Sequence, residues 1–164
     1  MVDKLVADIL LSSGVDIILS VPCKMLSGII LEIKRQPVQH IPVCREEEGV
    51  GIASGCALAG KKPMLLMQNS GLGNSINALM SLTRFYELPL FILMSHRGGK
   101  GEKISAQVPM GKASPPLLDA LNIDFLTVRN TADLEKLGDF IKKTFKGSSI
   151  NAAFLSRELW HESK

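Results

Sequence analysis

Residues 43–77 read VCREEEGVGIASGCALAGKKPMLLMQNSGLGNSIN, and this stretch decides the fold. Its pattern predicts the end of a strand, a helix of small residues from Glu46, a buried strand at 64–68, and a loop at 69–74 that leads into a second helix. A short apolar run between two helices is typical of a parallel sheet, because helices cover both faces of such a sheet.

Three glutamates open the first of these helices, where free backbone N–H groups and the helix dipole favour negative charge. At about 100° per residue, Glu46 shares a face with Val50 and Ala53, whereas Glu47 lies beside Ser54. A carboxylate on an apolar face is costly unless a partner binds it, and such an acid is suited to proton transfer. Glu46 is therefore the predicted catalytic residue, and simple helix capping is the alternative.

The segment Gly-Leu-Gly at 71–73 follows the buried strand, at the place where open α/β sheets present their ligands. Glycine allows a backbone to come close to a planar or charged ligand. We therefore expect this loop to bind a ligand beside Glu46. The alternative is an ordinary strand-to-helix turn that Asn74 or Ser75 caps.

Length and composition indicate one globular domain. The chain has 164 residues, of which 46% are hydrophobic and 21% charged. Its net charge of +3 is spread along the sequence, so we expect no nucleic-acid partner. Cys23, Cys44 and Cys56 have no metal-binding spacing, and no leader sequence is recognised, which favours the reducing cytoplasm. No apolar run approaches the roughly 20 residues of a membrane span.

The rest of the chain alternates helices and strands. Helices are expected at 3–13, 25–34, 75–85, 116–121 and 132–145, and further strands at 16–21, 38–44, 90–95, 125–128 and 152–155. This cadence predicts an α/β fold: a single domain over residues 1–164, with a six-stranded, mainly parallel sheet and helices on both faces. Residues 96–112 lack an apolar period, which predicts either a functional loop or a mobile surface loop.

The acid and the loop together resemble the pyrimidine-binding domain of thiamine-diphosphate enzymes, most closely that of the sulfopyruvate decarboxylase alpha subunits. In that superfamily an acid is followed nine residues later by a glycine, then by a strand and a Ser-Gly-x-Gly loop. The likeness covers essentially the whole chain, and NSGLGN at 69–74 is typical of sulfopyruvate and phosphonopyruvate decarboxylases. The matching residues are Glu46, Gly55, Ser70, Gly71, Gly73 and Asn77.

The resemblance implies roles for individual residues. Glu46 would hydrogen-bond the pyrimidine ring and drive its 4′-amino group to the imino form that takes the thiazolium C2 proton. Lys24 replaces an acid that is common in pyruvate decarboxylases, and it would attract a doubly charged substrate; an exposed lysine without a role is the alternative. The cofactor-binding candidates are Pro22, Glu46, Ser70, Gly71, Leu72, Gly73 and Asn74. The substrate-binding candidates are Lys24, His96, Arg97 and Gln107.

The resemblance also implies a partner. Family members hold the diphosphate through Mg²⁺ bound by Gly-Asp-Gly, a tripeptide that this sequence lacks, so we expect no metal ligand in this chain and a separate beta subunit that binds Mg²⁺. The expected assembly is a hetero-oligomer of alpha and beta pairs. The expected reaction converts 3-sulfopyruvate to sulfoacetaldehyde and CO₂, in the coenzyme M biosynthesis of methanogenic archaea. Two alternatives stay open: a phosphonopyruvate decarboxylase subunit, and a non-catalytic flavodoxin-like binding module.

Overall fold

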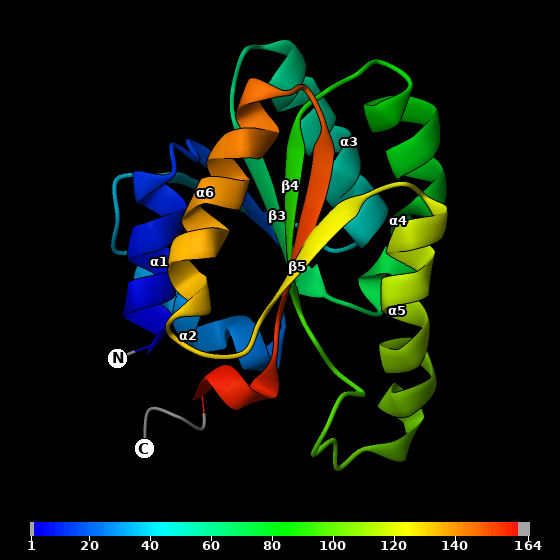
Figure 1. Ribbon diagram of the computed structural model, residues 1–164. Coiled ribbons are helices and arrows are strands. Elements are labelled where there is room, and N and C mark those ends of the chain that lie inside the picture. Colours follow the sequence, from blue (N-terminus) through cyan, green and yellow to red (C-terminus); the bar gives the residue numbers. More distant parts are fainter. Residues whose placement is uncertain (1, 161–164) are drawn as a thin grey trace.

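A six-stranded sheet forms the centre of the molecule, and the computed structural model describes residues 2–160 (Figure 1). The order of the strands in space is β2-β1-β3-β4-β6-β5, and every pair is parallel. The prediction of an α/β fold with six strands is confirmed, and the sheet is entirely rather than mainly parallel. The strands are β1 (Ile17–Ser20), β2 (Gln39–Pro42), β3 (Pro63–Gln68), β4 (Leu90–Ser95), β5 (Asp124–Val128) and β6 (Ile150–Leu155).

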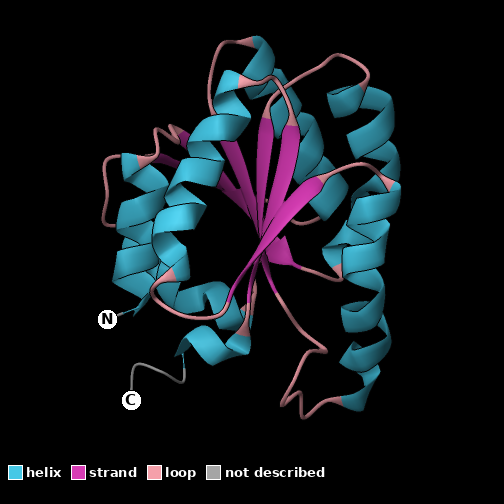
Figure 2. Cartoon of the chain, viewed as in Figure 1, coloured by secondary structure: helices cyan, strands magenta, loops and turns pink. Residues whose placement is uncertain are grey.

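Helices cover both faces of the sheet (Figures 1 and 2). One layer contains α1 (Val2–Ser12), α2 (Ser27–Ile33) and α6 (Asp133–Lys146). The other contains α3 (Glu46–Leu58), α4 (Gly71–Ala78) and α5 (Val108–Ala120). Shorter helical turns are η1 (Lys24–Leu26), the π-helical η2 (Leu79–Arg84), η3 (Ser105–Gln107) and η4 (Arg157–Trp160). Among the described helices, none combines the length and the apolar character needed to cross a bilayer.

The central strand β3 divides its side chains between two hydrophobic cores. Met64 and Leu66 pack in the core under α1, α2 and α6, whereas Leu65 and Met67 pack in the core under α3, α4 and α5. This division follows from the two-residue period of a strand. Because both faces are covered, β3 is apolar almost without interruption, which is the property that made it recognisable in the sequence.

The carboxyl ends of all strands lie along one edge, at the bottom of Figure 1. The connections into η1, α3, α4 and α5 start there. In open α/β sheets this is the edge where ligands bind. The same edge therefore carries the candidate catalytic, cofactor-binding and substrate-binding residues.

Helix α4 begins at Gly71, so the prediction that residues 71–74 form a loop is wrong. Two glycines in a first turn disfavour a helix in isolation. Leu72 overrides this preference, because its side chain is completely buried in the core with Leu79. Ser75 Oγ donates to the Gly71 carbonyl oxygen at 2.9 Å instead of capping the helix.

Helix α5 begins at Val108, well before the predicted start at residue 116. Prolines inside the helix obscured it, since Pro115 and Pro116 each lack a backbone donor. The predicted long loop at 96–112 is correspondingly shorter, and η3 occupies part of it. After β6 the chain forms η4, and residues 161–164 lie outside the described residues.

Candidate active site

The three glutamates at the start of α3 have different partners. Glu48 Oε2 accepts the backbone N–H of Cys44 at 2.9 Å, so this side chain turns back to the segment that precedes the helix. Glu47 Oε1 accepts a hydrogen bond from Arg45 Nε at 2.6 Å. Only Glu46 turns toward α4, as the helical period predicts.

Glu46 lies directly on Gly71. A Cβ atom added to Gly71 would come within 2.7 Å of both Glu46 Cδ and Oε1, so no other residue fits there without a shift. One turn further along α4, Asn74 Nδ2 donates to Glu46 Oε2 at 3.0 Å. The carboxyl group is therefore positioned by a steric contact and by a hydrogen bond, both from the first turn of α4.

The other glycines of the motif have different surroundings. A Cβ on Gly73 would meet only Met110 Cε, at 3.8 Å, and one on Gly55 would meet nothing within 4 Å. Both residues are exposed. Packing within this chain thus requires Gly71 but neither Gly55 nor Gly73, and of these two only Gly73 lies in the turn of α4 that contacts the acid.

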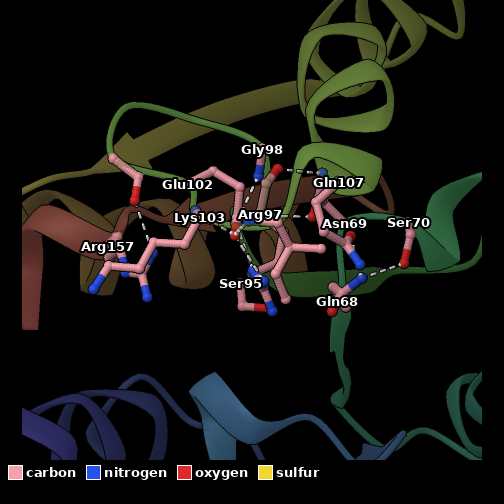
Figure 3. A network of polar contacts seen from close by, with 12 residues as sticks. Gln68, Asn69, Ser70, Ser95, Arg97, Gly98, Glu102, Lys103, Gln107 and Arg157 are labelled. Atoms are coloured by element: carbon pink, nitrogen blue, oxygen red, sulfur yellow. Dashed lines mark hydrogen bonds and ion pairs between the residues drawn. The ribbon is translucent and has the colours of Figure 1, made fainter.

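Ser70 and Gln107 are joined by a residue that the sequence analysis missed. Gln68 Nε2 donates to Ser70 Oγ at 2.6 Å and to Gln107 Oε1 at 3.1 Å (Figure 3). Gln68 is the last residue of β3, and Gln107 ends η3. The end of β3 and the β4–α5 connection therefore meet beside α4, which brings a predicted cofactor residue and a predicted substrate residue together.

Asn69 is a second missed residue, and it is completely buried. Its Nδ2 donates to the carbonyl oxygen of Arg97 and to Ser114 Oγ, both at 3.1 Å, and its Oδ1 accepts the Arg97 N–H at 2.9 Å. These bonds link β3, the end of β4 and α5. Asn69 therefore fixes the backbone on which the candidate site is built.

Asn69→Ala is expected to lower the free energy of unfolding by roughly 2–4 kcal/mol, because it removes the side-chain partner of the Arg97 backbone N–H and carbonyl groups and one of the two hydrogen bonds of Ser114. Urea denaturation measures the loss. Asn77→Ala is the control, since Asn77 is exposed on α4 and its change should cost less than about 0.5 kcal/mol. Equal losses in the two variants would contradict this assignment.

Arg97 is engaged inside its own loop. Its Nε donates to Glu102 Oε2 at 2.7 Å and its Nη2 to Glu102 Oε1 at 2.9 Å, while the two side chains are only 15% and 5% exposed (Figure 3). Glu102 also accepts the backbone N–H groups of Gly98, Lys103 and Ile104, at 3.1, 3.0 and 3.0 Å. Glu102 was not predicted from the sequence, because no motif marks it. Arg97, predicted to bind substrate, has its bidentate face occupied by this ion pair.

The Arg97 guanidinium, with the N–H groups of Ile104 and Gly98, holds the pKa of Glu102 well below its usual range. The hydrogen bonds that Arg97 donates to Glu102 in turn raise the pKa of Arg97. A carboxyl group whose pKa falls on folding stabilises the folded state at pH values above its pKa in the unfolded chain. This contribution is lost as the pH falls toward its pKa in the folded state.

Glu102→Gln is therefore expected to lower the thermal midpoint at pH 7, because Arg97 keeps its charge in a half-buried site without a counterion. The difference from the wild type should shrink as the pH falls below about 4.3, the value for an unperturbed Glu. Thermal melts at pH 7 and at successively lower pH values measure both effects. Exposed Glu135 provides the control Glu135→Gln, and a difference that stays constant with pH would contradict the ion-pair assignment.

His96 has a structural role that the sequence did not indicate. Its Nε2 donates to the Gly111 carbonyl oxygen at 3.2 Å, and its ring packs on Phe154 with centroids 4.8 Å apart. That carbonyl lies four residues before Pro115, which has no N–H to offer it. His96 thus replaces a helical hydrogen bond that the proline removes, and its predicted contact with substrate stays a prediction.

Lys24 is exposed at the end of β1, as the first residue of η1. It lines a cavity of about 480 Å³ together with Pro22, and a second cavity of about 590 Å³ together with Arg97. Cys23 Sγ lies 3.2 Å from Ser95 Oγ at the same edge. Within residues 2–160, no cluster of three or more His, Cys, Asp or Glu side chains could hold a metal ion.

The family described as thiamine pyrophosphate enzyme, N-terminal TPP binding domain, matches residues 1–122, a segment that contains Glu46, Gly71 and Asn74. The chain belongs to the thiamine pyrophosphate enzymes. The resemblance inferred from the acid and the glycine motif is confirmed.

Two relatives of this thiamine pyrophosphate enzyme chain come from methanogens. It is 48% identical over 129 residues to the sulfopyruvate decarboxylase subunit alpha of Methanococcus maripaludis, covering 78% of this chain and 77% of that one. It is 43% identical over 150 residues to the subunit of the same name from Methanothermobacter thermautotrophicus, covering 90% of this chain and 91% of that one.

A solved structure has the same fold. The 2-oxoglutarate:ferredoxin oxidoreductase of Magnetococcus marinus matches with a TM-score of 0.66 at 14% identity, covering 94% of this chain and 28% of that one.

The contact between α3 and α4 fits the cofactor of the thiamine pyrophosphate enzymes, thiamine diphosphate. Glu46 offers a carboxyl group held in place by Asn74, and the bare Cα of Gly71 leaves room for it. Gly73 is exposed and has no side chain, so no side chain projects from the surface at this position. Leu72 differs from the other predicted cofactor-binding residues of α4. Its side chain is buried, so only its backbone is available to a ligand. The cofactor contacts of these residues stay predictions.

Proposed function

We propose that the chain is the pyrimidine-binding subunit of a thiamine-diphosphate-dependent decarboxylase that converts 3-sulfopyruvate to sulfoacetaldehyde and CO₂. The observation that carries this proposal is the Glu46 carboxyl group, which lies on Gly71 and accepts a hydrogen bond from Asn74. The substrate is argued from the relatives named sulfopyruvate decarboxylase subunit alpha, at 48% and 43% identity.

Thiamine diphosphate, when bound, supplies the electron sink for the pair of electrons that the departing CO₂ leaves behind. Glu46 holds and exchanges a proton at a nitrogen of the pyrimidine ring. Asn74 orients the carboxyl group, and Gly71 allows it to lie against α4. Lys24, exposed at the same edge of the sheet, attracts the doubly charged substrate.

The proposal includes a partner. The word alpha in the names of the relatives supports a second, beta subunit, to which we assign the Mg²⁺ and the binding of the diphosphate. The open surface at Gly73, in the turn of α4 that contacts Glu46, supports a site that another chain completes. We place the hetero-oligomer in the cytoplasm and its reaction in coenzyme M biosynthesis. The three free cysteines support a reducing compartment.

The test combines the full chain with a beta subunit that carries Gly-Asp-Gly, thiamine diphosphate and Mg²⁺. Sulfopyruvate and phosphonopyruvate are supplied separately, and the release of CO₂ is measured. We expect faster turnover of sulfopyruvate, and we expect the full chain alone to bind the cofactor weakly. Preference for phosphonopyruvate would overturn the substrate assignment. A loaded complex that decarboxylates neither would overturn the function, and strong Mg²⁺-dependent cofactor binding by the chain alone would overturn the division of the site.

A further inference from the structure

We infer that a second cavity at the carboxyl edge of the sheet binds a small organic dianion. This cavity of about 590 Å³ lies between α1, α2, the β4–α5 connection and η4. We call it the basic cavity. Its lining residues are Asp3, Lys24, Met25, Ser27, Gly28, Arg97, Glu102, Lys103, Ile104, Arg157 and Trp160.

The charges around the basic cavity favour an anion. Four cationic and two acidic side chains line it, which gives a net charge of +2. Arg97 and Glu102 neutralise one another in their ion pair. For the other cations, Lys24, Lys103 and Arg157, no carboxylate of residues 2–160 lies within ion-pairing distance. Three like charges held around one cavity repel each other, and a bound dianion would relieve that repulsion.

The second acid of the basic cavity, Asp3, is already engaged. Its Oδ1 accepts the indole N–H of Trp160 at 2.8 Å, and its carboxyl group lies on the bare Cα of Gly28. Asp3 therefore joins α1, α2 and η4 at the wall of the cavity. It also holds the ring of Trp160 there.

The cationic rim of the basic cavity is fixed by hydrogen bonds from the loop. Glu102 accepts the backbone N–H groups of Lys103 and Ile104, so the ion pair with Arg97 also sets the course of this segment. On the opposite side, Arg157 Nη1 donates to the Gly101 carbonyl oxygen at 2.9 Å (Figure 3). The backbone of Lys103 and the side chain of Arg157 are therefore both held before a ligand arrives, which lowers the entropic cost of binding.

Apolar walls lie between these charges. Met25, Ile104 and Trp160 line the basic cavity, and Ile104 is 51% exposed. Such walls suit a short carbon chain, whereas the separated cations suit an acidic group at each end of it. The ligand class is thus a chain of a few carbon atoms with two acidic groups. That chemistry is shared by the proposed substrate and by other small dicarboxylates or sulfocarboxylates.

The basic cavity is separate from the candidate acid. Glu46, Gly71 and Asn74 belong to α3 and α4, on the other face of the sheet, and none of them lines the cavity. Direct binding to this chain does not require cofactor, partner or turnover. The outcome of a binding experiment therefore does not depend on whether the proposed decarboxylation is correct.

Trp160, the only tryptophan of the chain, provides the measurement. Succinate, 3-sulfopropionate or the monoanion butyrate is titrated into the full chain while the fluorescence of Trp160 is recorded. We expect a saturable change with the two dianions and binding of butyrate at least tenfold weaker. Lys103→Ala should weaken dianion binding about tenfold, the size of one charge-assisted contact. Lys100→Ala is the matched control, because Lys100 belongs to the same loop but lines a different cavity.

Equal weakening by Lys100→Ala and Lys103→Ala would overturn the proposal, because net charge alone would then explain binding. A chain that shows neither a fluorescence change nor a heat of binding by calorimetry with either dianion would also overturn it. A second experiment adds 3-sulfopropionate to the chain with its partner subunit and the substrate. It shows whether the basic cavity binds the substrate itself or a separate dianion. Competition with the substrate supports the basic cavity as the docking place of the substrate, and inhibition or activation without competition supports it as a site for a separate dianion.

Discussion

Glu46→Gln is expected to leave the chain folded and able to join its partner, while it slows hydrogen exchange at the thiazolium C2 by roughly a hundred- to ten-thousandfold. Glutamine has the same shape as glutamate, and its amide oxygen can still accept the hydrogen bond from Asn74. The amide cannot exchange a proton with the pyrimidine ring. The experiment compares C2 exchange by NMR in the two assembled complexes, with circular dichroism and gel filtration to verify folding and assembly.

Glu47→Gln is the matched control for this change. Glu47 is the next residue of the same helical turn, but its partner is Arg45 rather than α4. We expect C2 exchange in this variant to match the wild type. If the Glu46→Gln complex exchanged at the wild-type rate, the role of Glu46 as the proton-transfer residue would be rejected.

Gly71→Ala is expected to reduce C2 exchange and decarboxylation by about a hundredfold, even though it adds only one methyl group. The new Cβ would occupy the place of the Glu46 carboxyl group, so the acid must move. A displacement of about 1 Å at a catalytic group is enough for a loss of this size. The overpacking should cost about 1–3 kcal/mol of stability, partly offset by the better helix propensity of alanine.

Gly73→Ala tests whether the effect is steric. Gly73 lies in the same turn of α4, but its added Cβ would meet only Met110 Cε at 3.8 Å. This variant should retain the position of Glu46 and the stability of the wild type in urea denaturation. Substitution at residue 71 without loss of C2 exchange would show that the contact between Glu46 and Gly71 has no part in catalysis.

Periodicity was sufficient to predict the sheet and the direction in which Glu46 turns. Strand β3 is apolar on both faces because helices cover both, and Glu46 shares its helical face with buried Val50 and Ala53, so local pattern and tertiary packing agree there. The start of α4 could not be predicted, because burial of Leu72 outweighs the weak helix propensity of its glycine neighbours.

The loop after β4 shows where sequence patterns carry too little information. The Arg97–Glu102 ion pair depends on how residues 98–101 turn, and no spacing rule fixes that path. His96 has a partner only because Pro115 leaves a helical carbonyl free. Gln68 gave no signal beyond the polar end of an apolar strand, and Asn69 was noted only as the first residue of the NSGLGN motif. Their bonds to Gln107, Arg97 and Ser114 reach 28–45 residues further along the chain.

The order of the strands places β2 and β5 at the two borders of the described sheet, and this has a consequence for assembly. β2 is a short strand that ends in Pro42, a residue without an N–H, and β5 begins with exposed Asp124. An edge strand that is short, contains a proline or carries a charged residue is a poor template for a strand of another molecule. Growth by strand addition is therefore disfavoured, and another polypeptide would bind through helical surfaces or through the ends of the strands.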